Sequence, residues 1–123
     1  MKKEIVWPNG CQSAAMICVM LDAEFIWLSM DAQRYDTPKH RSMGEYGPLR
    51  GVDRILDALD RFHAKATFFT PGIFAESYPD TLKKIVQAGH EIALHGHRHE
   101  DFAALSPEEQ RAAIRQGYQS VTN

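Results

Sequence analysis

The chain has 123 residues, of which 44% are hydrophobic, enough for the core of one ordinary domain. Its 14 Lys and Arg are balanced by 16 Asp and Glu, giving a net charge of −2, and the absence of a basic run argues against nucleic acid as the main partner. The longest apolar run, residues 14–21, is too short for a membrane span, and no signal peptide follows Met1, so we expect a cytoplasmic protein without a membrane partner.

Apolar runs of strand length alternate with helical patterns along the chain. The first run, Met16–Leu21, ends at Asp22 and is typical of a buried parallel strand that is apolar on both faces. The polar segment 29–46 is predicted to form a long loop. It is followed by an amphipathic helix, whose apolar face is predicted to contain Val52, Ile55, Leu56 and Leu59.

The second half of the chain continues the alternation. A strand is predicted at 66–70, then a helix that begins near Pro79 and ends at the C-cap Gly89. The short run 91–94 forms a third strand, and a capping box at Ser106 with proline at the first helical position begins a last helix. The pattern predicts an α/β fold of about three βα units with a parallel sheet.

Polar side chains follow the first and third predicted strands. Asp22 ends the first strand and His95 ends the third, so both are expected at the rim where the carboxyl ends of parallel strands meet. His95 and His99 are four residues apart, and one helical turn would place them on one face with His97 pointing away. Two imidazoles and a carboxylate suit zinc and related ions. The alternative is that these histidines are solvated loop residues.

Five segments carry a resemblance to a known family. In the order VMLDAE (19–24), YGPLRG (46–51), ATFFTPG (66–72), AGHEI (88–92) and HGHRHE (95–100), they resemble the polysaccharide deacetylases. This is the NodB-homology group, carbohydrate esterase family 4, and the resemblance covers about residues 14–121. It implies that residues 1–123 are a single, incomplete N-terminal portion of a NodB-type domain, whose fold is a distorted (β/α) barrel.

The resemblance also implies a chemistry. Asp22, His95 and His99 would be the ligands of a divalent metal, most often Zn²⁺. The metal would activate a water that attacks an N-acyl or amide carbonyl, so that a non-peptide C–N bond is hydrolysed and an amine is released. The substrate would be an N-acetylated sugar or another small molecule.

One departure from the family concerns the general base. Members usually carry a second acid next to the metal-binding Asp or two residues before it, but Leu21 and Met20 hold those positions here. Glu24 is the nearest replacement and is predicted to be the catalytic base. The alternative is a solvated or ion-paired loop carboxylate, with Arg98 as its partner. The missing acid favours a small cyclic amide, an imide or ureide, over an acetylated sugar.

The other departure is length. A complete (β/α) barrel needs about 250 residues, and three βα units cannot close one. Either the chain is a fragment of a longer protein or an associated chain completes the site, and the open sheet edge favours a homo-oligomer. A truncated, non-catalytic metal-binding module is the remaining alternative.

Overall fold

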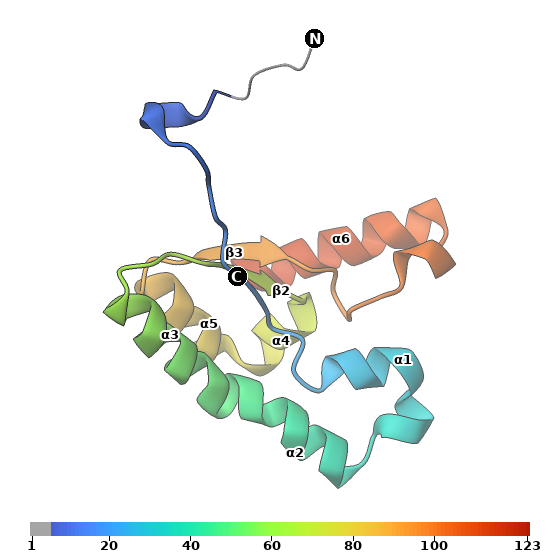
Figure 1. Cartoon of the computed structure of the whole chain (residues 1–123). Coiled ribbons are helices and arrows are strands. Elements are labelled where there is room, and N and C mark those ends of the chain that lie inside the picture. The colour runs from blue at the N-terminus through green and yellow to red at the C-terminus, as the bar shows by residue number, and fades with distance from the viewer. Residues whose placement is uncertain (1–5) are drawn as a thin grey trace.

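The structure, a computed structural model, describes residues 6–123. At its centre is a three-stranded parallel sheet in the order β1-β2-β3, formed by β1 (Cys18–Met20), β2 (Thr67–Thr70) and β3 (Glu91–Leu94). Val19 pairs with Phe68, and Phe68 pairs with Ile92. Because parallel neighbours need crossover connections, helices link the strands (Figure 1). The predicted α/β fold with a parallel sheet is confirmed.

The first crossover is almost entirely helical. It consists of α1 (Phe25–Tyr35), α2 (Pro38–Tyr46), a π-helical turn (Gly47–Gly51) and α3 (Val52–Arg61), the last three running on without a break. The prediction of a long loop at 29–46 is therefore wrong. Thr37 accepts a hydrogen bond from the His40 backbone N–H, and Pro38 follows it at the first helical position, which together start α2. α1 and α2 are largely solvent-exposed. Residues 29–46 therefore lack the regular spacing of apolar residues that marks a buried helical face.

The second crossover and the C-terminal segment agree more closely with the sequence pattern. They contain α4 (Gly72–Ser77), α5 (Pro79–Gln87), a 3-10 turn (Phe102–Ala104) and α6 (Pro107–Thr122). The capping box is confirmed: Ser106 Oγ accepts from the Glu109 N–H, and the Glu109 carboxylate accepts from the Ser106 N–H. Gly89 follows α5 with a φ of 75°, the left-handed conformation expected of a glycine C-cap.

The core lies around the central strand β2. Phe68, Phe74 and Ile85 are fully buried, and the cluster they form also contains Leu21, Val52, Leu59 and Ala66. β1 is an edge strand that pairs only with β2, and its first and last residues, Cys18 and Met20, are exposed. Met16 and Met20 are 87% and 54% exposed, which contradicts the prediction of a first strand buried on both faces.

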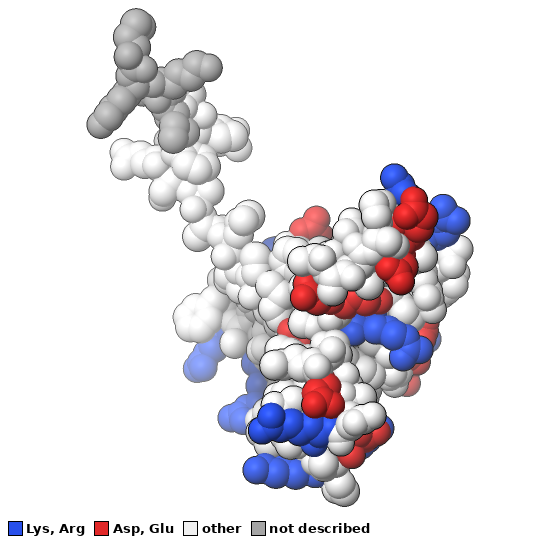
Figure 2. Space-filling model, turned by 90° about the vertical axis from the view of Figure 1, so that its right-hand side faces the viewer, with Lys and Arg blue, Asp and Glu red and all other residues white. Residues whose placement is uncertain are grey.

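The N-terminal segment and the charged surface lie outside the sheet and its core. An extended N-terminal segment with a 3-10 turn at Pro8–Gly10 leads into β1 and stands away from the body of the molecule (Figure 1). On the face in Figure 2, acidic and basic side chains lie near one another, so this face is mixed in charge. Between residue 6 and the last residue, no helix is both long and apolar enough to cross a membrane.

Candidate metal centre

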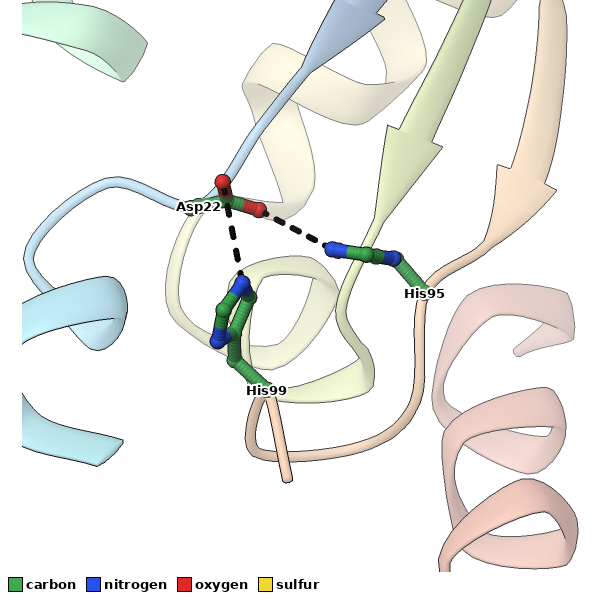
Figure 3. A group of neighbouring side chains, drawn as sticks. All are labelled: Asp22, His95 and His99. Atoms are coloured by element: carbon green, nitrogen blue, oxygen red, sulfur yellow. Dashed lines mark ion pairs between the residues drawn. The ribbon is translucent and has the colours of Figure 1, made fainter. Parts of the chain in front are cut away.

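Three side chains with metal-binding atoms meet beyond the carboxyl ends of β1 and β3. His95 Nε2 lies 3.6 Å from Asp22 Oδ1, and His99 Nε2 lies 3.8 Å from Asp22 Oδ2. The ligand atoms of the three residues all lie within 4.8 Å of one another. Figure 3 shows the Asp22 carboxylate facing both imidazoles. The structure thus brings together residues 73 and 77 positions apart in the sequence, at the rim where the strand ends predict them.

Asp22 is held by the end of the sheet and the start of α1. The Leu21 N–H donates to the carbonyl of Phe69, which continues the β1–β2 pairing up to the residue before Asp22. The Asp22 carbonyl then accepts from the Phe25 N–H at 3.0 Å, closing a turn in which Ala23 has a φ of 48°. The Asp22 side chain is only 15% exposed, and among the described residues its Oδ1 is buried without a hydrogen-bond partner.

The two histidines come from a loop rather than from a helical turn. The His95 N–H donates to the carbonyl of Thr70, the last residue of β2, and the chain then turns through Gly96 (φ 70°) and His99 (φ 60°). The expected helix over 95–99 is therefore absent. Left-handed backbone at Gly96 and His99 reverses the chain instead, and this folds the two imidazoles toward Asp22.

Glu100 stabilises this loop. Its carboxylate accepts hydrogen bonds from the backbone N–H groups of His97 and Arg98, both at 2.9 Å. Partial burial raises the pKa of Glu100, but the backbone N–H groups that bind its charged form outweigh this and hold the pKa below its ordinary value. A small hollow of about 100 Å³ lies beside the loop, lined by His95, Gly96, His99, Glu100 and Phe102.

His97 is placed away from the other two histidines. Its side chain is 2% exposed, and neither ring nitrogen has a hydrogen-bond partner among residues 6–123. A Cβ atom added at Gly72 would lie 2.6 Å from His97 Nδ1, so the ring packs directly on the glycine that begins α4. Gly96 and His97 also accept backbone hydrogen bonds from Gly72 and Ile73. His97 therefore fastens the loop to α4.

Glu24, the predicted base, faces Tyr78. It is 6% exposed, and its two carboxylate oxygens lie 3.0 and 3.1 Å from the Tyr78 hydroxyl, which donates to them. Burial, together with this hydrogen bond to a carboxylate, raises the pKa of Tyr78. The cluster of ligand atoms does not include Glu24. The contact favours an anchoring role for Glu24, and its role as general base stays a prediction.

Leu21 and Met20 occupy the two positions at which family members usually carry a second acid. Leu21 belongs to the buried core, while Met20 is half-exposed on the edge strand. Neither offers an oxygen to the site, as the sequence indicates.

The sequence gives no indication of one contact at the site. The Ser29 hydroxyl of α1 lies 3.2 Å from His99 Nδ1, the ring nitrogen that faces away from Asp22. The sequence predicts a loop over residues 29–46, and it contains no signal that places Ser29 near a histidine 70 residues away.

The donor set suits a divalent metal of the zinc type. Two imidazole nitrogens and a carboxylate are the ligands found in catalytic zinc sites with an open position. The buried Oδ1 of Asp22 supports the same interpretation, because a carboxylate oxygen without a hydrogen-bond donor is costly unless a cation compensates it. Asp22, His95 and His99 are the residues that could hold the ion.

The chain is similar to known proteins in both sequence and overall structure. The chain is 32% identical over 114 residues to a peptidoglycan deacetylase of Helicobacter pylori, covering 93% of this chain and 36% of the relative. The solved structure of a candidate polysaccharide deacetylase from Mycobacterium smegmatis superposes with a TM-score of 0.91 at 36% identity, covering 95% of this chain and 41% of the other. A Puue allantoinase superposes with a TM-score of 0.80 at 25% identity, covering 94% and 44%.

These alignments show that the chain spans between about a third and a half of the length of the proteins it resembles. The polysaccharide deacetylase family itself matches residues 43–123 and so covers most of the chain, including both histidines of the cluster. The chain belongs to the polysaccharide deacetylase family.

Proposed function

We propose that this chain carries the metal-binding part of a hydrolase that removes acyl groups from N-acetylated sugars, with Zn²⁺ as the metal. The observation that carries the proposal is the convergence of Asp22, His95 and His99 on one another, in a chain of the polysaccharide deacetylase family. The resemblance to a peptidoglycan deacetylase supports an amino-sugar polymer as the substrate class.

Each residue of the cluster has a distinct part in this proposal. Asp22 supplies the one negative charge of the ligand set, and the two imidazoles supply neutral nitrogen donors. A divalent metal held by these three residues would supply Lewis-acid chemistry, polarising a carbonyl and lowering the pKa of a bound water. The chain itself keeps the ligands in place through the β1 end and the loop that Glu100 stabilises.

A second candidate is the hydrolysis of a small cyclic amide, such as an imide or ureide. The similarity to an allantoinase over 94% of the chain supports it. The apolar Met20 and Leu21 support it too, because they replace the acid that sugar deacetylases of this family usually carry there.

A third candidate is a non-catalytic metal-binding module. The carboxylate of Glu24, the residue predicted to be the base, accepts hydrogen bonds from the Tyr78 hydroxyl instead of joining the cluster of ligand atoms. Without a base within hydrogen-bond reach of the attacking water, the metal ligands alone would bind an ion but give little turnover.

The test uses the longest natural reading frame that contains these residues. Its metal content is measured by elemental analysis, and hydrolysis is assayed on N-acetylglucosamine oligomers and on cyclic imides and ureides in parallel. Release of acetate from the oligomers is the expected result. Turnover of the cyclic amides alone supports the second candidate, and metal binding without any turnover supports the third. Absence of both bound metal and turnover would refute all three. Homo-oligomer formation and a cytoplasmic location stay predictions.

A further inference from the structure

We propose that Ser29 is a positioning residue that selects the ring tautomer of His99, so that the nitrogen facing Asp22 keeps its lone pair. The proposal rests on the metal-binding role proposed for His99. It assigns a purpose to α1, which lies next to the site but contributes none of its ligands.

The neighbours of Ser29 fix the direction of its hydroxyl proton. Ser29 Oγ lies 3.0 Å from the carbonyl oxygen of Ile26 and 3.2 Å from His99 Nδ1. A hydroxyl has one proton and two lone pairs, and a carbonyl oxygen can only accept. The proton of Ser29 is therefore directed to Ile26, and its oxygen is left as an acceptor for an N–H at His99 Nδ1.

A proton on Nδ1 of His99 determines the state of the other ring nitrogen. A neutral imidazole carries one proton, so a proton on Nδ1 leaves Nε2 with a free lone pair. It is Nε2 of His99 that lies 3.8 Å from Asp22 Oδ2, on the side of the ring facing the other ligand atoms. Partners that orient histidine ligands in this way are a general feature of metal sites.

Contacts at the start of α1 hold Ser29 in place. At the start of α1, the Glu24 carbonyl accepts from the Trp27 and Leu28 N–H groups, and the Glu24 side chain is buried against Tyr78. A Cβ atom added at Gly44 of α2 would lie 2.7 Å from the Glu24 Cβ, so α2 closes on the same residue.

The segment anchored through Glu24 has two roles at the site. Residues 22–29 supply the ligand Asp22 at one end and the hydrogen-bond acceptor Ser29 at the other. The segment that contains Asp22 therefore also fixes the position of His99 relative to Asp22, through Ser29. His95 is oriented differently, with its ring edge-on to the rings of Phe69 and His99.

The test compares Ser29→Ala with Ser29→Thr, which keeps the hydroxyl, and with Ser42→Ala on the exposed surface of α2 as a matched control. Nitrogen-15 NMR of the metal-free protein, at a pH where the imidazole is neutral, reports the tautomer of His99. Zinc affinity is measured by calorimetry. We expect the Nδ1–H form in the wild type, Ser29→Thr and Ser42→Ala, and a loss of that form in Ser29→Ala together with about tenfold weaker zinc binding.

The two readouts separate the proposals. An unchanged tautomer and zinc affinity in Ser29→Ala would overturn the positioning role while leaving the metal site intact. A changed tautomer in a protein that binds no zinc in any form would support the contact to His99 but refute the metal site. Failure of Ser29→Thr to restore the Nδ1–H form would also count against the proposal, because the hydroxyl is the group held responsible.

Discussion

His95 Nε2 lies 3.6 Å from Asp22 Oδ1, an oxygen that is buried and accepts no hydrogen bond from any described residue. A buried carboxylate oxygen without a donor is destabilising by about 1–3 kcal/mol or more. His95 does not satisfy it, because 3.6 Å is beyond hydrogen-bond distance, and His99 Nε2 faces the other oxygen, Oδ2, at 3.8 Å. Asp22, His95 and His99 are arranged as the ligands of a cation are, around a position between their side chains.

Replacement of Asp22 by Asn tests this ligand set directly. The wild type is expected to bind about one equivalent of zinc. Asp22→Asn is expected to weaken binding by more than about 100-fold, because losing a charged ligand costs more than losing a partner that merely orients one. Calorimetric titration gives both affinities. Asp80→Asn, at an exposed carboxylate of α5, is the matched control. Equal affinity in the wild type and Asp22→Asn would contradict the site.

The Glu24–Tyr78 contact predicts a difference between two substitutions of Glu24. Glu24→Ala leaves the Tyr78 hydroxyl without its acceptor and is expected to lower the free energy of unfolding by about 1–3 kcal/mol. Glu24→Gln keeps an oxygen that can accept from Tyr78, so its loss should be clearly smaller. Chemical denaturation followed by circular dichroism measures both. Equal losses for the two variants would show that the contact contributes little.

The same Glu24→Gln variant tests the predicted general base. An amide cannot take up a proton, so a base at this position would lose about 10²–10⁴-fold in turnover on substitution. If the variant keeps its stability and metal affinity but loses turnover to this extent, Glu24 is the base. Turnover close to that of the wild type would leave Glu24 with the anchoring role alone.

The glycine in the middle of α6 predicts a steric effect on the histidine loop. A Cβ atom at Gly117 would clash with the Gly96 carbonyl and lie 2.9 Å from Leu94 Cδ1. Because the Gly96 backbone cannot move without shifting His95, Gly117→Ala is expected to cost about 1–3 kcal/mol of stability and to weaken zinc binding. Gly47→Ala is the control, since an added Cβ there meets nothing within 4 Å. Thermal unfolding and zinc titration compare the two. Similar behaviour would contradict the close packing.

The sequence predicts those parts of the fold that depend on local signals. The three strands, the capping box at Ser106 and the left-handed Gly89 are all evident from residue type and spacing. The meeting of Asp22 with His95 also follows from sequence, because the carboxyl ends of parallel strands share one edge.

What the sequence does not predict depends on tertiary contacts. The helices within 29–46 lack an apolar period, because they lie largely in solvent. The loop geometry of His99 depends on Glu100 accepting from two backbone N–H groups, which residue spacing does not reveal. The burial of Glu24 depends on Tyr78, 54 residues away, and no local pattern connects them.

The strand-start histidine, His90, predicts a dependence of stability on pH. Burial, and then the charge of Lys65, lower the pKa of His90 below its ordinary value of 6.5, and its Nδ1 accepts from the Ala66 N–H. The folded protein therefore favours neutral His90, whereas the unfolded chain binds a proton more readily. The resulting stability is present above the unfolded pKa and is lost as the pH falls through 6.5 toward the folded value.

Urea unfolding at a series of pH values measures this loss. In His90→Asn the decline below pH 6.5 should be shallower than in the wild type, because the titrating group is gone. Lys65→Gln should show an intermediate slope, since it removes the second cause of the shift but not the first. If the wild type and His90→Asn decline in parallel, the proton uptake lies at other groups, and the burial of His90 does not control the acid sensitivity of the sheet.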